Sequence, residues 1–302
     1  MSSQAKPASI IREGSSLYYS LLWTEAEPKQ RFCERLSLIR SLSTTLDDVQ
    51  EPQVAEKKIH WWHEELQRLH QGEARHPSTT ANQPQLTGLD AALSASLDIV
   101  SVASTQRFTP AATEEESDAH LVRSYGAKLA LLCHALSDDV QTLATDQQSD
   151  KAALAFGLHD QLVRLPSLIH RGMPVFSDEL YKQFSTQPQE LAKHIRVADS
   201  PALNNIPIVT ENTGRRELVS HAIERAHRAF EEAVNDTPTQ QRYRHDTLIP
   251  LWRLLVLRKK QLDLWQARKP DLLRETMTLT PIAKLYNAWK NKRPYAANIK
   301  LH

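Results

Sequence analysis

Apolar residues recur every three to four positions along most of the chain, which is the period of one face of an α-helix. The clearest stretch lies at 115–137, and its apolar stripe is formed by Leu121, Tyr125, Leu129, Leu132 and Leu136. Few segments show the alternation of β-branched or aromatic residues with polar ones that is typical of strands. The pattern therefore predicts an all-α protein.

Prolines and glycines divide this pattern into separate helices. Pro28 and Pro52 fit the first turns of helices, where the missing N–H of proline costs nothing, and Gly72 fits a helix stop. We expect helices from near Ser15 and then over 28–47, 52–71, 88–104, 115–137, 151–170, 177–184, 187–196, 214–235, 245–267 and 270–290. The segments expected to be loops or polar connections are 73–88, 105–114, 138–150 and 198–213.

No segment has the composition of a linker between domains. Each expected helix has one apolar stripe, and a single shared core is the simplest way to bury all of these stripes. We therefore expect one domain over residues 15–290. Residues 1–14 are expected to form a flexible arm, and residues 291–302 a flexible tail.

Composition and charge narrow the functional classes. The chain has only 7 Gly in 302 residues, as suits a mostly helical protein, and its formal net charge of +1 argues against a nucleic-acid partner. The two cysteines, Cys33 and Cys133, lie in apolar helical stretches and are interpreted as buried free thiols. No apolar run approaches the roughly 20 residues that span a bilayer. We therefore expect a cytoplasmic protein without a transmembrane segment, for which peripheral contact with a membrane stays open.

The segment 48–77 carries a recognisable set of residues. Its motifs, in order, are Glu51–Pro52, Trp61–Trp62, Glu65–Leu66, Gly72 and His76–Pro77. This set resembles the squalene/phytoene synthase family, and weaker pieces extend the resemblance over about 15–290. The resemblance implies the isoprenoid synthase fold, a helical bundle around a central cavity. Active members join two prenyl diphosphates head to head with Mg²⁺, which two aspartate-rich motifs hold from facing helices.

The chain departs from the family at both metal-binding motifs. Aligned with the family, the first motif falls on Ser43, Thr44 and Asp47, and the second on Arg164 and Leu168. An arginine repels a nearby cation, and a leucine offers no oxygen ligand. In this respect the chain resembles a non-catalytic branch that includes bacterial phytoene-synthase-like proteins and a mitochondrial complex I assembly factor. The resemblance thus implies a pseudoenzyme without a cofactor, which binds an isoprenoid lipid, a prenyl diphosphate or a protein partner.

An active prenyl-diphosphate transferase is the alternative, and it needs displaced carboxylates to hold Mg²⁺. The candidates are Asp47, Asp48, Glu51 and Asp160, and the first three spell an Asp-Asp-x-x-Glu motif. Because Pro52 follows at once, this run is also interpreted as a helix end and turn with solvated acids. Asp138–Asp139 has the same interpretation.

A cationic diphosphate site without metal is also open. Its candidates are Arg164, His170 and Arg171, with His159 nearby in the sequence. The competing interpretation is that these cations form ion pairs with Asp160 and neighbouring acids.

Three further groups are interpreted as structural. His60, His63 and Glu64 are polar flanks of a helix buried through Trp62, and Trp61–Trp62 is a core pair. A late basic cluster is interpreted as a solvated helix face, and it comprises Arg253, Arg258, Lys259 and Lys260.

Overall fold

The computed structural model describes residues 10–143, 150–193 and 213–292, and within these ranges the chain forms helices and no strands. The prediction of an all-α fold is therefore confirmed. The outer parts of the expected arm and tail, residues 1–9 and 293–302, lie outside the described residues, as does almost all of the loop expected at 198–213.

The helices of the first half come in this order: α1 (Ser16–Ser20), α2 (Ala26–Ser43), α3 (Pro52–Gln71), α4 (Pro77–Leu86), α5 (Asp90–Phe108) and α6 (Glu114–Ser137). Those of the second half are the short 3-10 helix η2 (Val140–Leu143), α7 (Asp150–His170), α8 (Asp178–Gln183), α9 (Pro188–Ala192), α10 (Thr213–Asn235), α11 (Thr237–Tyr243), α12 (Ile249–Arg268) and α13 (Pro281–Lys290).

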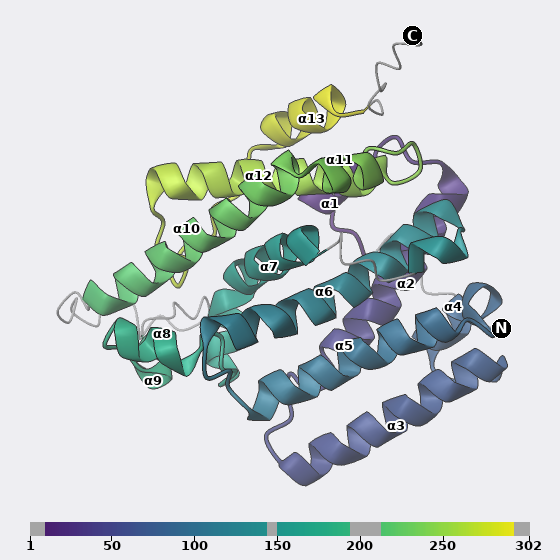
Figure 1. The fold of residues 1–302 in the computed structure, drawn as a ribbon, viewed down its shortest axis with the longest axis horizontal. Helices are drawn as coiled ribbons and strands as arrows, with labels where there is room; N and C mark the ends of the chain where they lie inside the picture. Colours follow the sequence, from purple (N-terminus) through teal and green to yellow (C-terminus); the bar gives the residue numbers. More distant parts are fainter. Residues whose placement is uncertain (1–9, 144–149, 194–212, 293–302) are drawn as a thin grey trace.

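The long helices pack side by side in one series. Successive neighbours run from α3 through α5, α6, α7, α10 and α12 to α13, as Figure 1 shows from bottom to top. Helix α2 crosses this series and packs on α4, α5 and α6, while the short α1 packs on α12 and α13. One continuous apolar cluster runs through α2, α3, α5, α6, α7, α10 and α12, whereas α13 contributes no residue to it.

Helices α6 and α7 form the centre of the bundle and can approach each other closely because of a glycine. A Cβ at Gly157 of α7 would lie 3.1 Å from both Leu121 Cβ and Tyr125 Cδ2 of α6. Leu131 of α6 and Leu165 of α7 are completely buried. Burial of such a leucine stabilises the fold by about 2 kcal/mol.

The expected loop at 73–88 is wrong, because most of it is helix α4. The apolar period is absent there, and the helix is instead anchored by polar side chains that are completely buried. The Thr79 hydroxyl donates to Glu65 of α3, and the Asn82 amide donates to the Glu34 carbonyl of α2. Pro77 occupies the first turn, where a proline is tolerated.

The end of the chain also differs from the expectation. The helix expected at 270–290 begins only at Pro281, because Lys269 adopts a left-handed conformation at the end of α12 and Pro270 follows it. Helix α11 was not foreseen in the gap between the expected helices at 214–235 and 245–267, and Asp236 caps it by accepting from the Thr239 amide.

Candidate functional site

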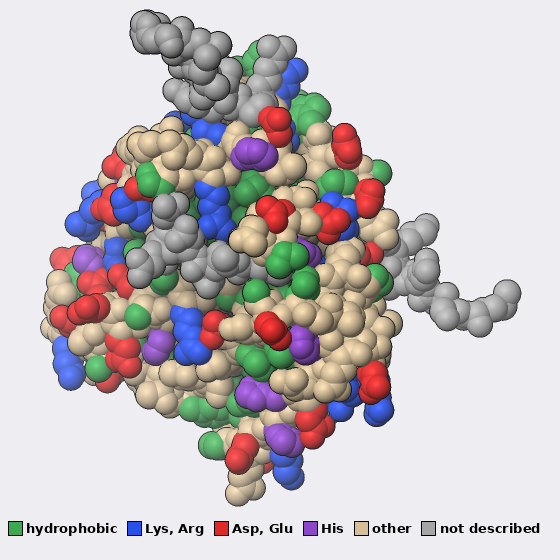
Figure 2. Space-filling view, turned by 45° about the vertical axis from the view of Figure 1, so that its right-hand side comes forward, with side chains coloured by type: hydrophobic (Ala, Val, Ile, Leu, Met, Phe, Trp, Pro, Cys, Tyr) green, Lys and Arg blue, Asp and Glu red, His purple; other side chains and the backbone are tan. Residues whose placement is uncertain are grey.

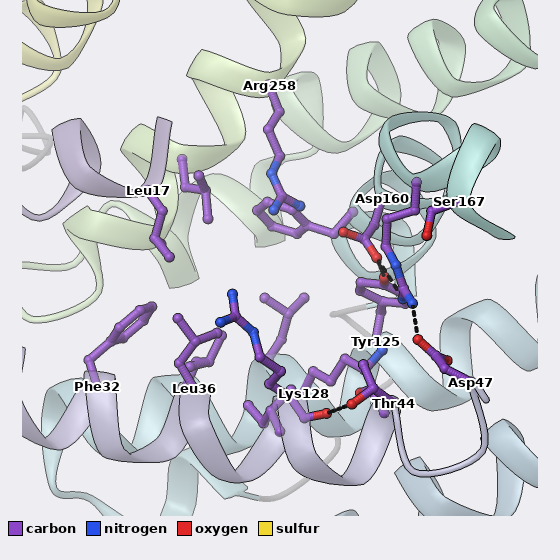
Figure 3. A pocket seen from close by; sticks show the side chains of 18 of the residues that line it. Leu17, Phe32, Leu36, Thr44, Asp47, Tyr125, Lys128, Asp160, Ser167 and Arg258 are labelled. Atoms are coloured by element: carbon purple, nitrogen blue, oxygen red, sulfur yellow. Dashed lines mark hydrogen bonds and ion pairs between the residues drawn. The ribbon is translucent and has the colours of Figure 1, made fainter. Parts of the chain in front are cut away.

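A cavity of about 600 Å³ lies inside the bundle, between helices α1, α2, α6, α7 and α12. Helix α2 with the turn after it, and helix α7, carry the segments aligned with the two metal-binding motifs, and both line the cavity. Its walls divide into two ends, which Figure 3 shows side by side. The apolar end is lined by Leu17, Phe32, Leu36, Ile39, Leu129, Leu132, Phe156, Leu251 and Leu254. The polar end carries the charged side chains.

Five basic and three acidic side chains line the cavity. The bases are Arg40, Lys128, Arg164, Arg171 and Arg258, and the acids are Asp47, Asp48 and Asp160. The excess of cations makes the polar end attractive to an anion.

Asp47 lines the polar end of the cavity from the turn after α2 and is almost completely buried. Two arginines hold the same carboxylate oxygen, with Arg171 Nη1 at 2.5 Å and Arg164 Nη2 at 3.1 Å from Asp47 Oδ2. The interpretation of Asp47 as a solvated acid is therefore wrong, because the turn after α2 folds this side chain inward against α7. The neighbouring Asp48 also lines the cavity but is 84% exposed.

Arg164 bridges two carboxylates that come from different helices. Besides Asp47, it approaches Asp160 one turn earlier in α7, with Nη1 3.6 Å from Oδ2. The same Asp160 oxygen accepts a hydrogen bond of 2.5 Å from the Tyr125 hydroxyl of α6. A cation supplied by the protein thus lies between the carboxylates that face this part of the cavity.

The local field keeps Asp160 ionised. Burial by itself would raise the pKa of Asp160, but Arg164, Arg258 and Lys128 together with the Tyr125 hydroxyl lower it below its ordinary value. For Tyr125, burial and the Asp160 charge raise the pKa, so its hydroxyl keeps its proton and donates.

Lys128 and Arg258 extend toward the cavity from α6 and α12 (Figure 3), and neither forms an ion pair with the residues that the structure describes. The Lys128 ammonium lies 3.9 Å from the Tyr125 ring centroid, and the Arg258 guanidinium lies 4.8 Å from that of Phe156. Burial lowers the pKa of Lys128 to about 8, with Asp160 opposing and Arg164 adding to this effect.

The turn that carries Asp47 is held from two sides. Trp62 of α3 donates its indole N–H to Thr45 Oγ1 at 2.7 Å. The buried Arg107 at the end of α5 donates to the Val49 carbonyl at 2.7 Å and to the Arg171 carbonyl at 3.0 Å. Arg107 therefore connects the turn that carries Asp47 to the segment that carries Arg171, and so helps to position these two side chains.

Some of the site residues that the sequence suggested line the cavity, and others do not. Ser43, Thr44, Asp47, Arg164 and Arg171 line the cavity together. Leu168 lies instead on a small adjoining pocket of about 70 Å³. Neither Glu51, which precedes α3, nor His170, which is exposed at the end of α7, lines the cavity.

His159 belongs to the core and not to a diphosphate site. Its ring stacks on Trp265 with centroids 5.6 Å apart, and its Nε2 lies 3.3 Å from Gln261 Oε1. Burial, with a contribution from Arg258, lowers the pKa of His159 to about 3, so this side chain is neutral and cannot neutralise an anion at ordinary pH.

The late basic cluster is not one solvated face, so that interpretation is wrong for two of its members. Arg253 is 2% exposed because it donates to the carbonyls of Ser20, Asn291 and Lys292, and Arg258 lines the cavity. Lys259 and Lys260 form ion pairs with Asp263.

The other candidates outside the cavity are structural or solvated. His60 and Glu64 form an exposed pair at 3.1 Å, and His63 is exposed beside them. Trp62 is buried, as expected for a core residue, whereas Trp61 is 41% exposed.

Asp138 adopts a left-handed conformation at the end of α6, and Asp139 accepts from the Gln141 amide. Both cysteines are buried and unbridged, as predicted.

Lys128 and Arg258 were missed as cavity residues. Lys128 could have been found, because it lies three positions after Tyr125 in an otherwise apolar stripe, and a lysine there requires polar space in front of it. For Arg258 the sequence offered no such signal.

The donor set does not fit a magnesium ion. Among the residues that the structure describes, no group of three or more acidic, histidine or cysteine side chains could hold a metal. The inward-facing carboxylates Asp47 and Asp160 are bound by arginine and tyrosine donors, and Mg²⁺ needs several oxygen ligands in octahedral geometry.

Comparison with known proteins is consistent with this architecture. The sequence model of the squalene/phytoene synthase family matches residues 11–252, which is most of the chain. The chain belongs to the squalene/phytoene synthase family. A solved structure described as a dehydrosqualene synthase in complex with ligand superposes on this family member with a TM-score of 0.69. That match covers 95% of this chain and 93% of the other at 12% identity, which shows the shared isoprenoid synthase fold. Comparison with curated proteins gave no match.

Proposed function

We propose that the protein binds a prenyl diphosphate or a related phosphorylated isoprenoid lipid without metal and does not transfer the prenyl group. The observation that carries this proposal is the position of Arg164 between Asp47 and Asp160. Together with Arg171, which also pairs with Asp47, this guanidinium offsets the charges of both carboxylates, so the remaining cations offer an anion fixed positive charges in place of a bound cation.

The two ends of the cavity match the two parts of such a ligand. An isoprenoid chain would lie against the leucines and phenylalanines of the apolar end, where burial of each CH₂ group contributes about 0.8 kcal/mol. The diphosphate would face Lys128 and Arg258, whose charges are not neutralised by ion pairs with the described residues. Burial lowers the pKa of Lys128 to about 8, so this side chain is mostly protonated at pH 7 and can pair with an anion.

A direct test is calorimetric titration of farnesyl diphosphate into the full chain in the presence of EDTA. We expect binding without metal, weakened about tenfold or more by Arg258→Gln, because the neutral amide cannot pair with phosphate. The matched control is Arg123→Gln, whose side chain is 56% exposed, pairs with Asp98 and does not line the cavity. Farnesol serves as the probe for the chain alone and should bind more weakly than the diphosphate.

The active transferase is the second candidate, and one observation favours it: Asp47, Asp48 and Asp160 line the same cavity. Magnesium-dependent release of diphosphate from farnesyl or geranylgeranyl diphosphate would support it and contradict the pseudoenzyme proposal. If release occurred, its loss in the Asp47→Ala and Asp160→Ala variants would identify these two residues as the carboxylates that hold Mg²⁺. A protein partner and the cytoplasmic compartment remain parts of the proposal that this titration does not address.

A further inference from the structure

Helix α13 turns its apolar side outward. Ile282, Leu285, Tyr286 and Trp289 follow the i, i+3, i+4, i+7 spacing of a single helix face, and they are 81%, 45%, 57% and 53% exposed. The buried side of the same helix contains Lys284 and Ala288. This arrangement is the reverse of that in an ordinary surface helix, so the apolar face is available to an external surface.

Specific contacts hold α13 in this orientation. The ammonium group of the buried Lys284 donates to the Gly14 carbonyl at 2.8 Å. At the other end of the helix, Arg253 of α12 donates to the carbonyls of Asn291 and Lys292, and Trp252 Nε1 donates to Asn291 Oδ1 at 3.3 Å. Because both ends are tied to the bundle, the outward face belongs to the fold itself.

Aromatic and basic side chains frame this face. The Tyr286 and Trp289 ring centroids lie 6.4 Å apart, and Lys292 lies 5.7 Å from the Trp289 ring. Trp23, which is 43% exposed, lies 5.1 Å from the Arg253 guanidinium and thus beside the same end of α13. Tryptophan and tyrosine next to lysine are typical of segments that lie at a membrane–water interface.

The charge of the segment identifies the kind of surface. Residues 276–292 contain three lysines and no Asp or Glu, although the whole chain carries a net charge of only +1, and Lys290 and Lys292 are exposed. Elsewhere acids and bases are mixed, as Figure 2 shows for one face of the molecule. A local excess of cations next to an apolar face complements anionic headgroups above a hydrocarbon layer.

We propose that α13 docks the protein on the surface of an anionic phospholipid bilayer, lying in the interface with Ile282, Leu285, Tyr286 and Trp289 inserted. Insertion of this kind does not span the membrane, since a helix of 10 residues is only about 15 Å long. Within the described residues no helix is long and apolar enough to cross a membrane. The proposal does not depend on the ligand of the cavity.

The position of α13 has a consequence for the cavity. Helix α13 packs on α1 and α12, which also supply Leu17, Leu251 and Leu254 to the apolar end. A bilayer on this face would therefore lie next to the helices that enclose that end.

Flotation of the full chain with vesicles tests the docking surface. We expect the protein to float with phosphatidylcholine vesicles that contain phosphatidylglycerol, and much less with phosphatidylcholine alone. The double variant Ile282→Ser/Trp289→Ser should lower partitioning more than tenfold, because it removes apolar contact area. The control variant Val54→Ser/Val163→Ser changes two apolar side chains on α3 and α7, which are 42% and 49% exposed, and should float like the wild type.

Charge is tested separately. Lys290→Gln/Lys292→Gln should lower partitioning by about fivefold per lysine at low salt and flatten its salt dependence. The control Lys57→Gln/Lys182→Gln removes two exposed lysines elsewhere and should leave partitioning unchanged. Circular dichroism confirms that each variant is folded.

Three results would overturn the proposal. The wild type could fail to float with anionic vesicles, or the Ile282→Ser/Trp289→Ser variant could float equally well. Analytical ultracentrifugation could also show a dimer that this variant dissociates, and the face would then be an interface between two copies. Failure of farnesyl diphosphate binding would leave the flotation result unchanged, so the two proposals fail independently.

Discussion

The region that identifies the family and the region that would perform its chemistry each contain a buried carboxylate. The first region contains Glu65 and the second contains Asp47. Glu65 is completely buried between α3 and α4 and accepts from the Arg75 and His76 amides, each at 2.8 Å. Asp47 is also buried, but its partners are two long arginine side chains from α7. The first carboxylate is held by two backbone amides as well as by the side chains of Thr79 and Arg68, whereas the second is held only by side chains.

The contrast shows what the 48–77 signature means physically. Glu65, Gly72 and His76–Pro77 together form the junction between α3 and α4: Gly72 takes the left-handed conformation that ends α3, and His76 and Pro77 begin α4. Every one of these roles is structural. The most specific motif in the sequence thus reports the fold and not the chemistry of the cavity.

Loss of Glu65 is expected to have the largest effect. Glu65→Gln replaces two acceptor oxygens by one and places an amide donor among donors, so the free energy of unfolding should fall by about 3 kcal/mol in urea denaturation. The matched control is Glu64→Gln on the exposed side of the same helix, which should cost less than about 0.5 kcal/mol.

The pH dependence of stability sharpens the same prediction. Burial would raise the pKa of Glu65, but hydrogen bonds from the His76 amide, Thr79, the Arg75 amide and Arg68 lower it from 4.5 to about 2. Because the folded-state pKa is depressed, this stabilisation is complete above pH 4.5 and is lost as the pH falls toward 2. The wild type should lose stability in this window faster than Glu65→Gln, and equal pH slopes would contradict the assignment.

Asp47→Asn should lower stability less than Glu65→Gln does, and it should strengthen anion binding. Removing the charge leaves Arg164 and Arg171 without their shared counterion, so stability should fall by about 1–2 kcal/mol. The polar end also becomes more positive, and farnesyl diphosphate should bind about tenfold more tightly. Asp48→Asn, at an exposed neighbour, should change neither measurement appreciably. Weaker binding in Asp47→Asn would contradict a purely electrostatic anion site.

Lys128→Met is expected to have the smallest effect on stability. Unlike Glu65→Gln, it should raise stability. Burial lowers the pKa of Lys128, so its charged form is less stable in the fold than in the unfolded chain. At pH 7 the variant should be more stable than the wild type by roughly 0.5–1 kcal/mol.

The sign of the Lys128 effect can be checked by thermal unfolding at several pH values. The unfolded chain binds more protons than the fold between pH 8 and 10.5, so the wild type gains stability as pH rises through this window. The difference between variant and wild type should therefore shrink between pH 8 and 10.5. A difference that stays constant would mean that Lys128 is fully solvated.

Much of the fold could be predicted because apolar periodicity is a local property. The expected helix at 115–137 matches α6 within one residue, and the one at 52–71 matches α3. Helix α4 could not be predicted in this way, since Thr79 and Asn82 are buried only through partners on α3 and α2. The sequence by itself thus determined the helices that follow the apolar period and the family resemblance.

The tertiary structure alone decided how the remaining charges are used. It folds Asp47 inward while Asp48 stays exposed, places Arg164 between Asp47 and Asp160, and brings Arg258 of α12 to the same cavity as charged side chains of α2, α6 and α7. It also orients α13 with its apolar face outward. These outcomes depend on which side of a helix meets a distant neighbour, and burial of that side depends on packing that the local pattern does not encode.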